Sequence, residues 1–206
     1  MTIRAVFFDL GGVIVRTEFQ APRQKLAERF GMDYEDIDRI VFGGGSNGAA
    51  AKAALGEVSA DEHWKAVARK LKIRGEEIAS VRAQFFGGDV VDWNLIQFIR
   101  SLRPRYKTGL ISNAWSDLRE YILKQKFDDA FDSMVISAEV GAVKPEARIF
   151  QIALDQLKVK AKEAVFVDDV LEHIEACEKV GMKGIHFRDA ESTMRQLETL
   201  LASAGV

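Results

Sequence analysis

The chain has 206 residues, of which 29 are basic and 31 acidic, and its formal net charge is −2. This balance, with no basic block along the chain, argues against a nucleic-acid partner. No apolar run approaches the ~20 residues that a membrane span needs, and no signal-peptide pattern precedes the first expected strand, so we expect no membrane partner and a cytoplasmic protein. The single cysteine, Cys177, excludes an internal disulfide and a multi-cysteine zinc site, and its spacing from Ile174 predicts a packed core thiol.

A short apolar run, Ala5–Phe8, ends in Asp9, and Gly11 and Gly12 follow closely. Such a run predicts a strand buried on both faces, and the glycines allow backbone amides to approach whatever Asp9 contacts. Taken alone, the stretch fits either a functional carboxylate at a strand end or an ordinary turn aspartate.

Between Thr17 and Phe86 the sequence predicts a series of helices with few strand candidates, which indicates a helical insertion. Ser59 and Glu62 have the spacing of a capping box, and one apolar face follows, with His63 beside it as a surface or packing residue. We also expect Asn47 to cap a helix over residues 48–55.

Strand and helix patterns then alternate. Asp92 is expected to cap a helix that contains apolar residues from Trp93 to Leu102, and Pro145 is placed at the first position of a later helix. Strands are predicted at 107–111, 133–136, 164–167 and 183–187, with helices at about 116–124, after Pro145, between residues 169 and 181, and around Met194–Leu201. This alternation predicts an α/β fold with a doubly wound, mostly parallel sheet.

Polar residues follow three of these strands: Asp9, the pair Ser112-Asn113, and the pair Asp168-Asp169. Ligands of doubly wound sheets bind beyond the carboxyl ends of the strands, near the point where strand order reverses. We therefore expect these groups to form one site, joined by Lys144 at the start of a helix on the same edge.

Four separated stretches resemble the motifs of the haloacid dehalogenase-like superfamily, whose members include phosphatases with helical caps. They are Phe8-Asp9-Leu10-Gly11-Gly12-Val13, Ile111-Ser112-Asn113, Val140-Gly141-Ala142-Val143-Lys144-Pro145 and Phe166-Val167-Asp168-Asp169. The resemblance covers essentially the whole chain and implies a core domain formed by residues 1–15 and 92–206, with an α-helical cap domain over 16–91.

The resemblance also implies a Mg²⁺-dependent phosphatase that hydrolyses a small phosphorylated metabolite, with a sugar phosphate as one candidate. Asp9 resembles the nucleophile that forms an aspartyl-phosphate. Asp9, the Gly11 carbonyl and Asp169 resemble the magnesium ligands, and Asp168 an outer or water-mediated partner. Leu10, Gly11, Ser112, Asn113 and Lys144 resemble the residues that bind the phosphate. By the same resemblance, Lys144 also offsets the negative charge during catalysis.

Two positions depart from the family pattern. Gly11 stands where most of the phosphatases carry a second aspartate as general acid and base, and His173 stands where aspartate or asparagine is usual. Two alternatives stay open: a haloacid dehalogenase-type hydrolase, which the acids Asp168 and Asp169 disfavour, and a phosphate-binding protein with little turnover. The oligomeric state, monomer or homodimer, is open too.

Three further features have competing interpretations. Residues 43–48 match the dinucleotide pattern Gly-x-Gly-x-x-Gly, but a helix-like segment precedes them where that fingerprint requires a strand, so we expect a mobile cap loop. Trp115 either lies beside the substrate or packs under the cap. His186, at the end of the last strand, is expected to be structural.

Overall fold

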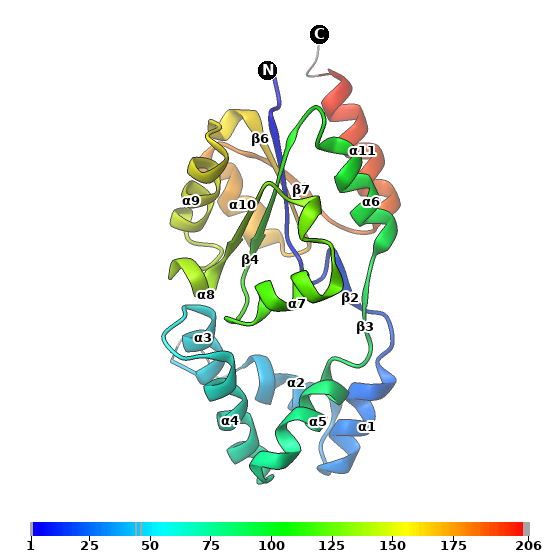
Figure 1. Cartoon of the computed structure of the whole chain (residues 1–206), viewed down its shortest axis with the longest axis vertical. Helices are drawn as coiled ribbons and strands as arrows, with labels where there is room; N and C mark the ends of the chain where they lie inside the picture. The colour runs from blue at the N-terminus through cyan, green and yellow to red at the C-terminus, as the bar shows by residue number, and fades with distance from the viewer. Residues whose placement is uncertain (1, 44, 46, 204–206) are drawn as a thin grey trace.

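The computed structural model describes residues 2–43, 45 and 47–203. Its centre is a five-stranded sheet in the order β5-β4-β1-β6-β7, with every neighbouring pair parallel (Figure 1). The strands are β1 (Ala5–Phe8), β4 (Lys107–Ser112), β5 (Ser133–Ile136), β6 (Ala164–Asp168) and β7 (Lys183–His186). The doubly wound parallel sheet predicted from the sequence is thus confirmed, with β1 at the point where strand order reverses.

Helices cover both faces of this sheet because successive side chains of a strand point to opposite sides. In β1, Val6 and Phe8 join an apolar cluster with helices on one face, whereas Ala5 and Phe7 join a second cluster on the other face. The first face carries α6 (Trp93–Leu102), α7 (Leu118–Gln125) and α11 (Ala190–Ser203), and the second carries α9 (Ala147–Leu157) and α10 (Leu171–Val180). All four residues of β1 are fully buried, as a central strand requires.

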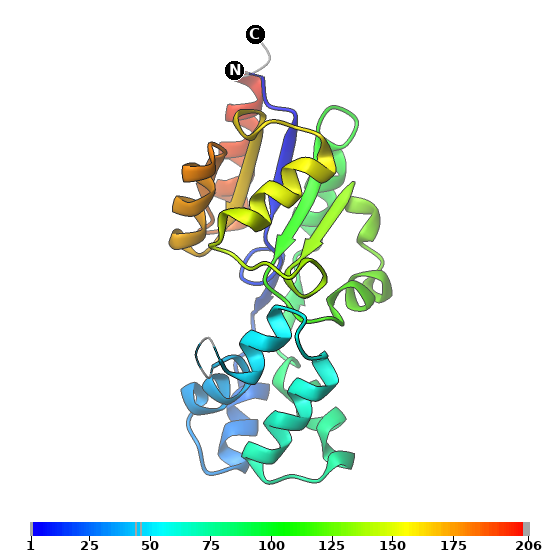
Figure 2. The same cartoon turned by 90° about the vertical axis from the view of Figure 1, so that its left-hand side faces the viewer.

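A separate helical part lies beyond the carboxyl edge of the sheet (Figures 1 and 2). It comprises α1 (Ala21–Arg29), α2 (Tyr34–Phe42), α3 (Ala49–Ala54), α4 (Ala60–Leu71) and α5 (Ile78–Phe85). These helices have an apolar cluster of their own, in which Trp64 and Phe85 are almost fully buried. The helices predicted between Thr17 and Phe86 are therefore present.

A two-stranded antiparallel ribbon, β2 (Val15–Thr17) with β3 (Asp89–Val91), connects the helical part to the sheet. These short strands were not predicted from the sequence. Arg23 of α1 contacts the ribbon through Asp89 of β3, which lies 3.4 Å from its guanidinium. The same guanidinium lies 2.7 Å from Asp38 and 4.1 Å from the Phe85 ring centroid. Because Arg23 is only 6% exposed, both carboxylates offset a charge that is largely removed from water.

The predicted helix caps had mixed outcomes. Ser59 forms the capping box at the start of α4, and the Asp92 side chain accepts a hydrogen bond from the Leu95 backbone N–H in α6. Asn47 was wrongly assigned as a cap, because Gly48 occupies that position and α3 begins without a side-chain cap. Of the loop over 43–48, residues 44 and 46 lie outside the described ranges.

The position of Pro145 was also predicted wrongly. Helix α9 begins at Ala147 with Glu146 at its N-cap, so Pro145 precedes the helix. The backbone of Lys144 is held by the side chain of Asn113, the residue after β4, which keeps this segment in the loop. A four-residue helix, α8 (Ser137–Val140), lies between β5 and this loop. None of the helices in the described ranges combines the length and apolar character needed to cross a membrane.

Candidate active site

The carboxyl ends of β1, β4 and β6 bring the expected site residues together. Asp9 directly follows β1, and its backbone N–H donates to the Val167 carbonyl of β6 at 2.9 Å. Ser112 is the last residue of β4 and is buried, and Asp168 is the last residue of β6. The site therefore lies where strand order reverses, as predicted for ligand sites in doubly wound sheets.

Lys144 joins the two acidic strand ends. Its Nζ lies 2.9 Å from Asp9 Oδ2 and 2.6 Å from Asp168 Oδ2, and the side chains of Lys144 and Asp168 have no exposed surface. An ammonium group buried to this extent requires compensating charge, which the two carboxylates supply. Lys144 is thus an integral part of this edge, not a solvated lysine before a helix.

The Asn113 side chain holds the backbone of Lys144. Its Oδ1 accepts a hydrogen bond from the Lys144 N–H at 2.7 Å, and its Nδ2 donates to the Lys144 carbonyl at 2.9 Å. Both polar groups of the amide are therefore engaged. This paired contact fixes the loop that carries Lys144 relative to the end of β4.

Asp9 lies in surroundings that disfavour its charge. The pKa of Asp9 is raised to about 6, because burial, with a smaller contribution from the charge of Asp168, outweighs the Lys144 ammonium, which lowers it. The Leu10 backbone N–H donates to Asp9 Oδ1 at 2.7 Å and also favours the ionised form. The two oxygens of Asp9 thus have different partners, the Leu10 amide and Lys144.

Asp168 has the opposite balance. Burial opposes its ionisation, but the hydrogen bond from His173 and the charge of Lys144 outweigh burial and lower the pKa of Asp168. His173 Nδ1 lies 3.0 and 3.1 Å from the two carboxylate oxygens, and the Val170 N–H donates to Oδ1 at 2.8 Å. His173 therefore holds Asp168, a role that its sequence position alone did not reveal.

Asp169 is more exposed than Asp168 and faces Gly12. Burial and the neighbouring charge of Asp168 raise the pKa of Asp169. Within the described ranges, no lysine, arginine or histidine forms an ion pair with its carboxylate. His186 Nε2 lies 2.9 Å from the Asp169 backbone oxygen, which fits the structural role expected for His186.

The donors at this edge suit a hard cation. Asp9, Asp168 and His173 each place one ligand atom within 4.8 Å of the others, but the Lys144 ammonium already lies against both carboxylates. Asp169 instead offers a carboxylate without a cationic partner among the described residues. Carboxylate and carbonyl oxygens are the ligands that Mg²⁺ prefers, so Asp9, Asp169 and the Gly11 carbonyl fit this ion by their chemistry.

Comparison with known proteins identifies the family. A model of the haloacid dehalogenase-like hydrolases matches residues 3–181. The chain belongs to this family. As a haloacid dehalogenase-like hydrolase it is an enzyme, and its relatives include phosphatases.

Two curated relatives and one solved structure illustrate the similarity. The chain is 26% identical to bifunctional epoxide hydrolase 2 of Sus scrofa, over 96% of its own length but 39% of that protein. It is 27% identical to D-ribitol-5-phosphate phosphatase of Bacteroides thetaiotaomicron, over 98% of the chain and 100% of that protein. A HAD family enzyme from Bacteroides thetaiotaomicron, in complex with magnesium and inorganic phosphate, has the same fold with a TM-score of 0.77 and 18% identity, covering 90% of this chain and 94% of that one.

The remaining residues singled out in the sequence have packing roles. Cys177 is buried, and burial raises the pKa of its thiol to about 12, as expected for a core thiol. His63 is 1% exposed and packs between Trp64 and Trp115. Trp115 is half-buried against rings of the helical part, so the packing interpretation is the one that the structure supports.

Proposed function

We propose that this hydrolase is a Mg²⁺-dependent phosphatase that acts on a small phosphorylated metabolite, with Asp9 as the nucleophile. The observation that carries the proposal is the pair of contacts that the buried Lys144 ammonium makes with Asp9 and Asp168 at the reversal point of the sheet. The D-ribitol-5-phosphate phosphatase relative and the magnesium and phosphate complex of a similar fold support it.

In this proposal, Asp9 performs the reaction in two steps. A carboxylate oxygen of Asp9 attacks phosphorus while the ester P–O bond breaks, and the alcohol leaves with a proton taken from solvent. Water then attacks the phosphorus of the aspartyl-phosphate, releasing inorganic phosphate and restoring the carboxylate. Lys144 offsets the negative charge that gathers between Asp9 and the phosphoryl group, and Ser112 and the backbone of Leu10, Gly11 and Asn113 contact that group.

Asp9, the Gly11 carbonyl and Asp169 are the residues that would hold Mg²⁺. When bound, this cation adds positive charge against the phosphoryl oxygens. Asp168 contributes through Lys144, because it fixes the ammonium while His173 and the Val170 amide fix Asp168. The departure at His173 therefore leaves an intact set of contacts around Asp168.

We also propose that residues 16–91 act as a cap domain over a core formed by 1–15 and 92–206. The β2–β3 ribbon is the covalent connection between the two, since both crossings of the chain pass through it. A cap in this position restricts water and selects the organic group of the substrate.

A direct assay tests the proposed function. Release of phosphate from p-nitrophenyl phosphate and from a panel of phosphorylated metabolites is measured with Mg²⁺, after chelation, and in Asp9→Asn. We expect activity in the wild type only with metal, its loss in Asp9→Asn, and wild-type rates in the exposed-site control Asp155→Asn. Full activity in Asp9→Asn or after exhaustive chelation would refute the mechanism, and metal-independent halide release from 2-haloacids would favour the dehalogenase alternative.

A further inference from the structure

Trp115 connects the proposed phosphate-binding loop to the helical cap. It follows Asn113 by two residues, and its ring packs against rings that belong to the cap. The centroid distances from Trp115 are 4.2 Å to His63, 5.7 Å to Phe42, 6.1 Å to Trp64 and 6.4 Å to Phe86. A side chain from the sheet-containing part thus joins the apolar cluster of the cap.

The next two residues also contact the cap. Ser116 Oγ accepts a hydrogen bond from the Ala60 backbone N–H at the start of α4, at 3.1 Å. The Asp117 carboxylate pairs with Arg82 of α5. Three consecutive residues, 115 to 117, therefore contact the cap through three different kinds of interaction.

The preceding residues are fixed to the core instead. Asn113 makes two hydrogen bonds with the Lys144 backbone, and Ser137 Oγ accepts from the Ala114 N–H at 3.0 Å and donates to the Ala114 carbonyl at 3.1 Å. The loop from Ser112 to Asp117 is thus held at one end by the active site and at the other by the cap. Ala114, the one residue between Asn113 and Trp115, is itself hydrogen-bonded to Ser137.

We propose that Trp115 is a positioning residue that makes the placement of Ser112, Asn113 and Lys144 depend on the docking of the cap. The proposal rests on the phosphatase function above. Removing the indole leaves a void among the cap rings and frees the loop at Trp115. Because small displacements of positioned groups slow a reaction strongly, the loss falls on the chemical step more than on substrate binding.

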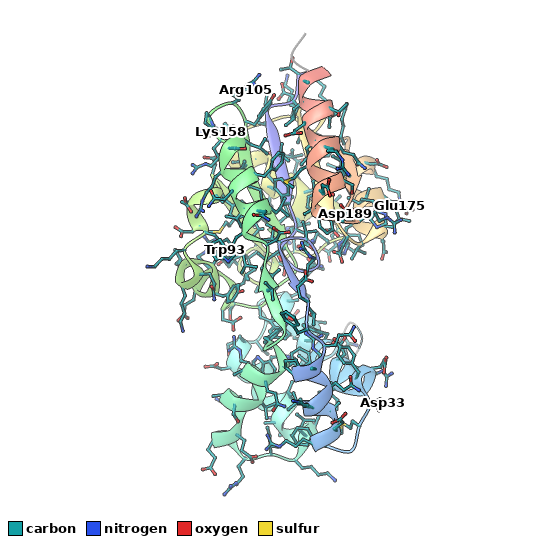
Figure 3. The ribbon with its side chains drawn as sticks, turned by 90° about the vertical axis from the view of Figure 1, so that its right-hand side faces the viewer. Asp33, Trp93, Arg105, Lys158, Glu175 and Asp189 are labelled. Atoms are coloured by element: carbon teal, nitrogen blue, oxygen red, sulfur yellow. The ribbon has the colours of Figure 1, made fainter. Side chains whose placement is uncertain are left out.

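Steady-state kinetics with p-nitrophenyl phosphate and Mg²⁺ test this role in Trp115→Ala, Trp115→Phe and the matched control Trp93→Ala. Trp93 lies on α6 in the sheet-containing part (Figure 3) and is 43% exposed. We expect kcat to fall roughly 10- to 100-fold in Trp115→Ala with KM little changed, to recover largely in Trp115→Phe, and to stay near wild type in Trp93→Ala. An unchanged kcat in a folded Trp115→Ala protein would overturn the proposal, as would an increase confined to KM, which would mean that the indole contacts the leaving group.

Amide hydrogen exchange provides a second readout that needs no activity. In the ligand-free protein we expect residues 112–114 to exchange faster in Trp115→Ala than in the wild type, Trp115→Phe or Trp93→Ala, with β1 unaffected. Equal exchange in all four proteins would overturn the coupling.

If Trp115→Ala does not fold, Trp115→Leu is used, with smaller changes expected in the same direction. A wild type inactive on every phosphate ester would refute the proposed function, while the exchange result would still decide the coupling.

Discussion

Gly11 and Gly12 are adjacent glycines with different structural requirements. Gly12 has a φ of +77°, and a Cβ there would lie 2.1 Å from Asp169 Oδ2, so a side chain would displace that carboxylate. A Cβ on Gly11 would meet no atom within 4 Å, and its φ lies outside the left-handed region. The backbone therefore does not require a glycine at residue 11, and the absence of an aspartate there is a difference in chemistry only.

Gly11→Asp should therefore be accommodated and should restore general acid–base assistance. Such assistance is typically worth ~10²–10⁴-fold and matters most for poor leaving groups. We expect the wild type to prefer aryl, acyl or anomeric phosphates over alkyl phosphates, and Gly11→Asp to narrow that difference by raising kcat/KM on alkyl phosphates. Rates on both substrate classes provide the measurement.

Gly12→Asp is the matched control, because it adds the same carboxylate where it collides with Asp169. This variant should lose activity on both classes. A folded Gly11→Asp protein that binds Mg²⁺ normally but gains nothing on alkyl phosphates would contradict the account, and would indicate that another group already supplies the proton. His63 is a poor candidate for that group, since it is buried and burial lowers its pKa to about 4.

Asp9 also affects stability, because its pKa rises from the ordinary value of 3.8 to about 6 in the folded protein. Between these values the folded state binds more protons than the unfolded state, so the contribution of Asp9 to stability falls as pH rises through this window. In Asp9→Asn the cost of the buried charge disappears, and Lys144 keeps Asp168 as its partner.

We therefore expect metal-free Asp9→Asn to unfold at a higher temperature than the metal-free wild type above about pH 6, despite its loss of activity. The difference should shrink as pH falls and vanish below about pH 3.8. Thermal unfolding of both proteins across this range is the measurement, with Asp155→Asn as the surface control. A difference that stays constant with pH would show that Asp9 is not the titrating group.

Secondary structure was predictable wherever the signal was local. The buried run of β1, the capping box at Ser59 and the apolar spacing of α9 each specify their element through neighbouring residues. The β2–β3 ribbon was missed because its strands are three residues each and pair across the whole helical insertion. The start of α9 was misplaced for a similar reason, since contacts with Asn113, distant in sequence, hold Lys144 and Pro145 outside the helix.

The Ser59 cap gives a quantitative test at the start of α4. Its side chain accepts a hydrogen bond from the Glu62 backbone N–H, and losing an N-cap side chain typically costs about 1 kcal/mol. Ser59→Ala should lower the free energy of unfolding by about that amount, measured by denaturant titration. Ser101→Ala, at an exposed position within α6, is the control and should change it by less. Equal effects of the two substitutions would argue against a capping contribution.

Across the whole molecule, the strand topology made it possible to group the strand-end residues from the sequence. Contacts that this topology does not specify could not be predicted. Parallel strands bring their carboxyl ends to one edge, so Asp9, Ser112 and Asp168 could be grouped from the sequence. The place of Trp115 among the rings of the helical part depends on how elements distant in sequence pack, so no local pattern encodes it. His173 is only five residues from Asp168, but its contact depends on how the turn between β6 and α10 orients the imidazole, and the sequence therefore left the roles of both residues open.

The acidic edge predicts how the whole chain responds to ligands. Asp9 and Asp169 both lie near the Asp168 carboxylate, and burial together with the charge of Asp168 raises the pKa of each. A ligand that binds only the native state at 100 times its Kd adds about 2.7 kcal/mol, which corresponds to roughly 5–10 °C for a chain of this size. We expect Mg²⁺ with inorganic phosphate to produce such a shift in thermal unfolding, and Asp169→Ala to abolish most of it.

Glu175→Ala, which removes an exposed carboxylate from α10 (Figure 3), should keep the full shift. An undiminished shift in Asp169→Ala would place the metal elsewhere, whereas loss of the shift in both variants would point to a general effect of charge.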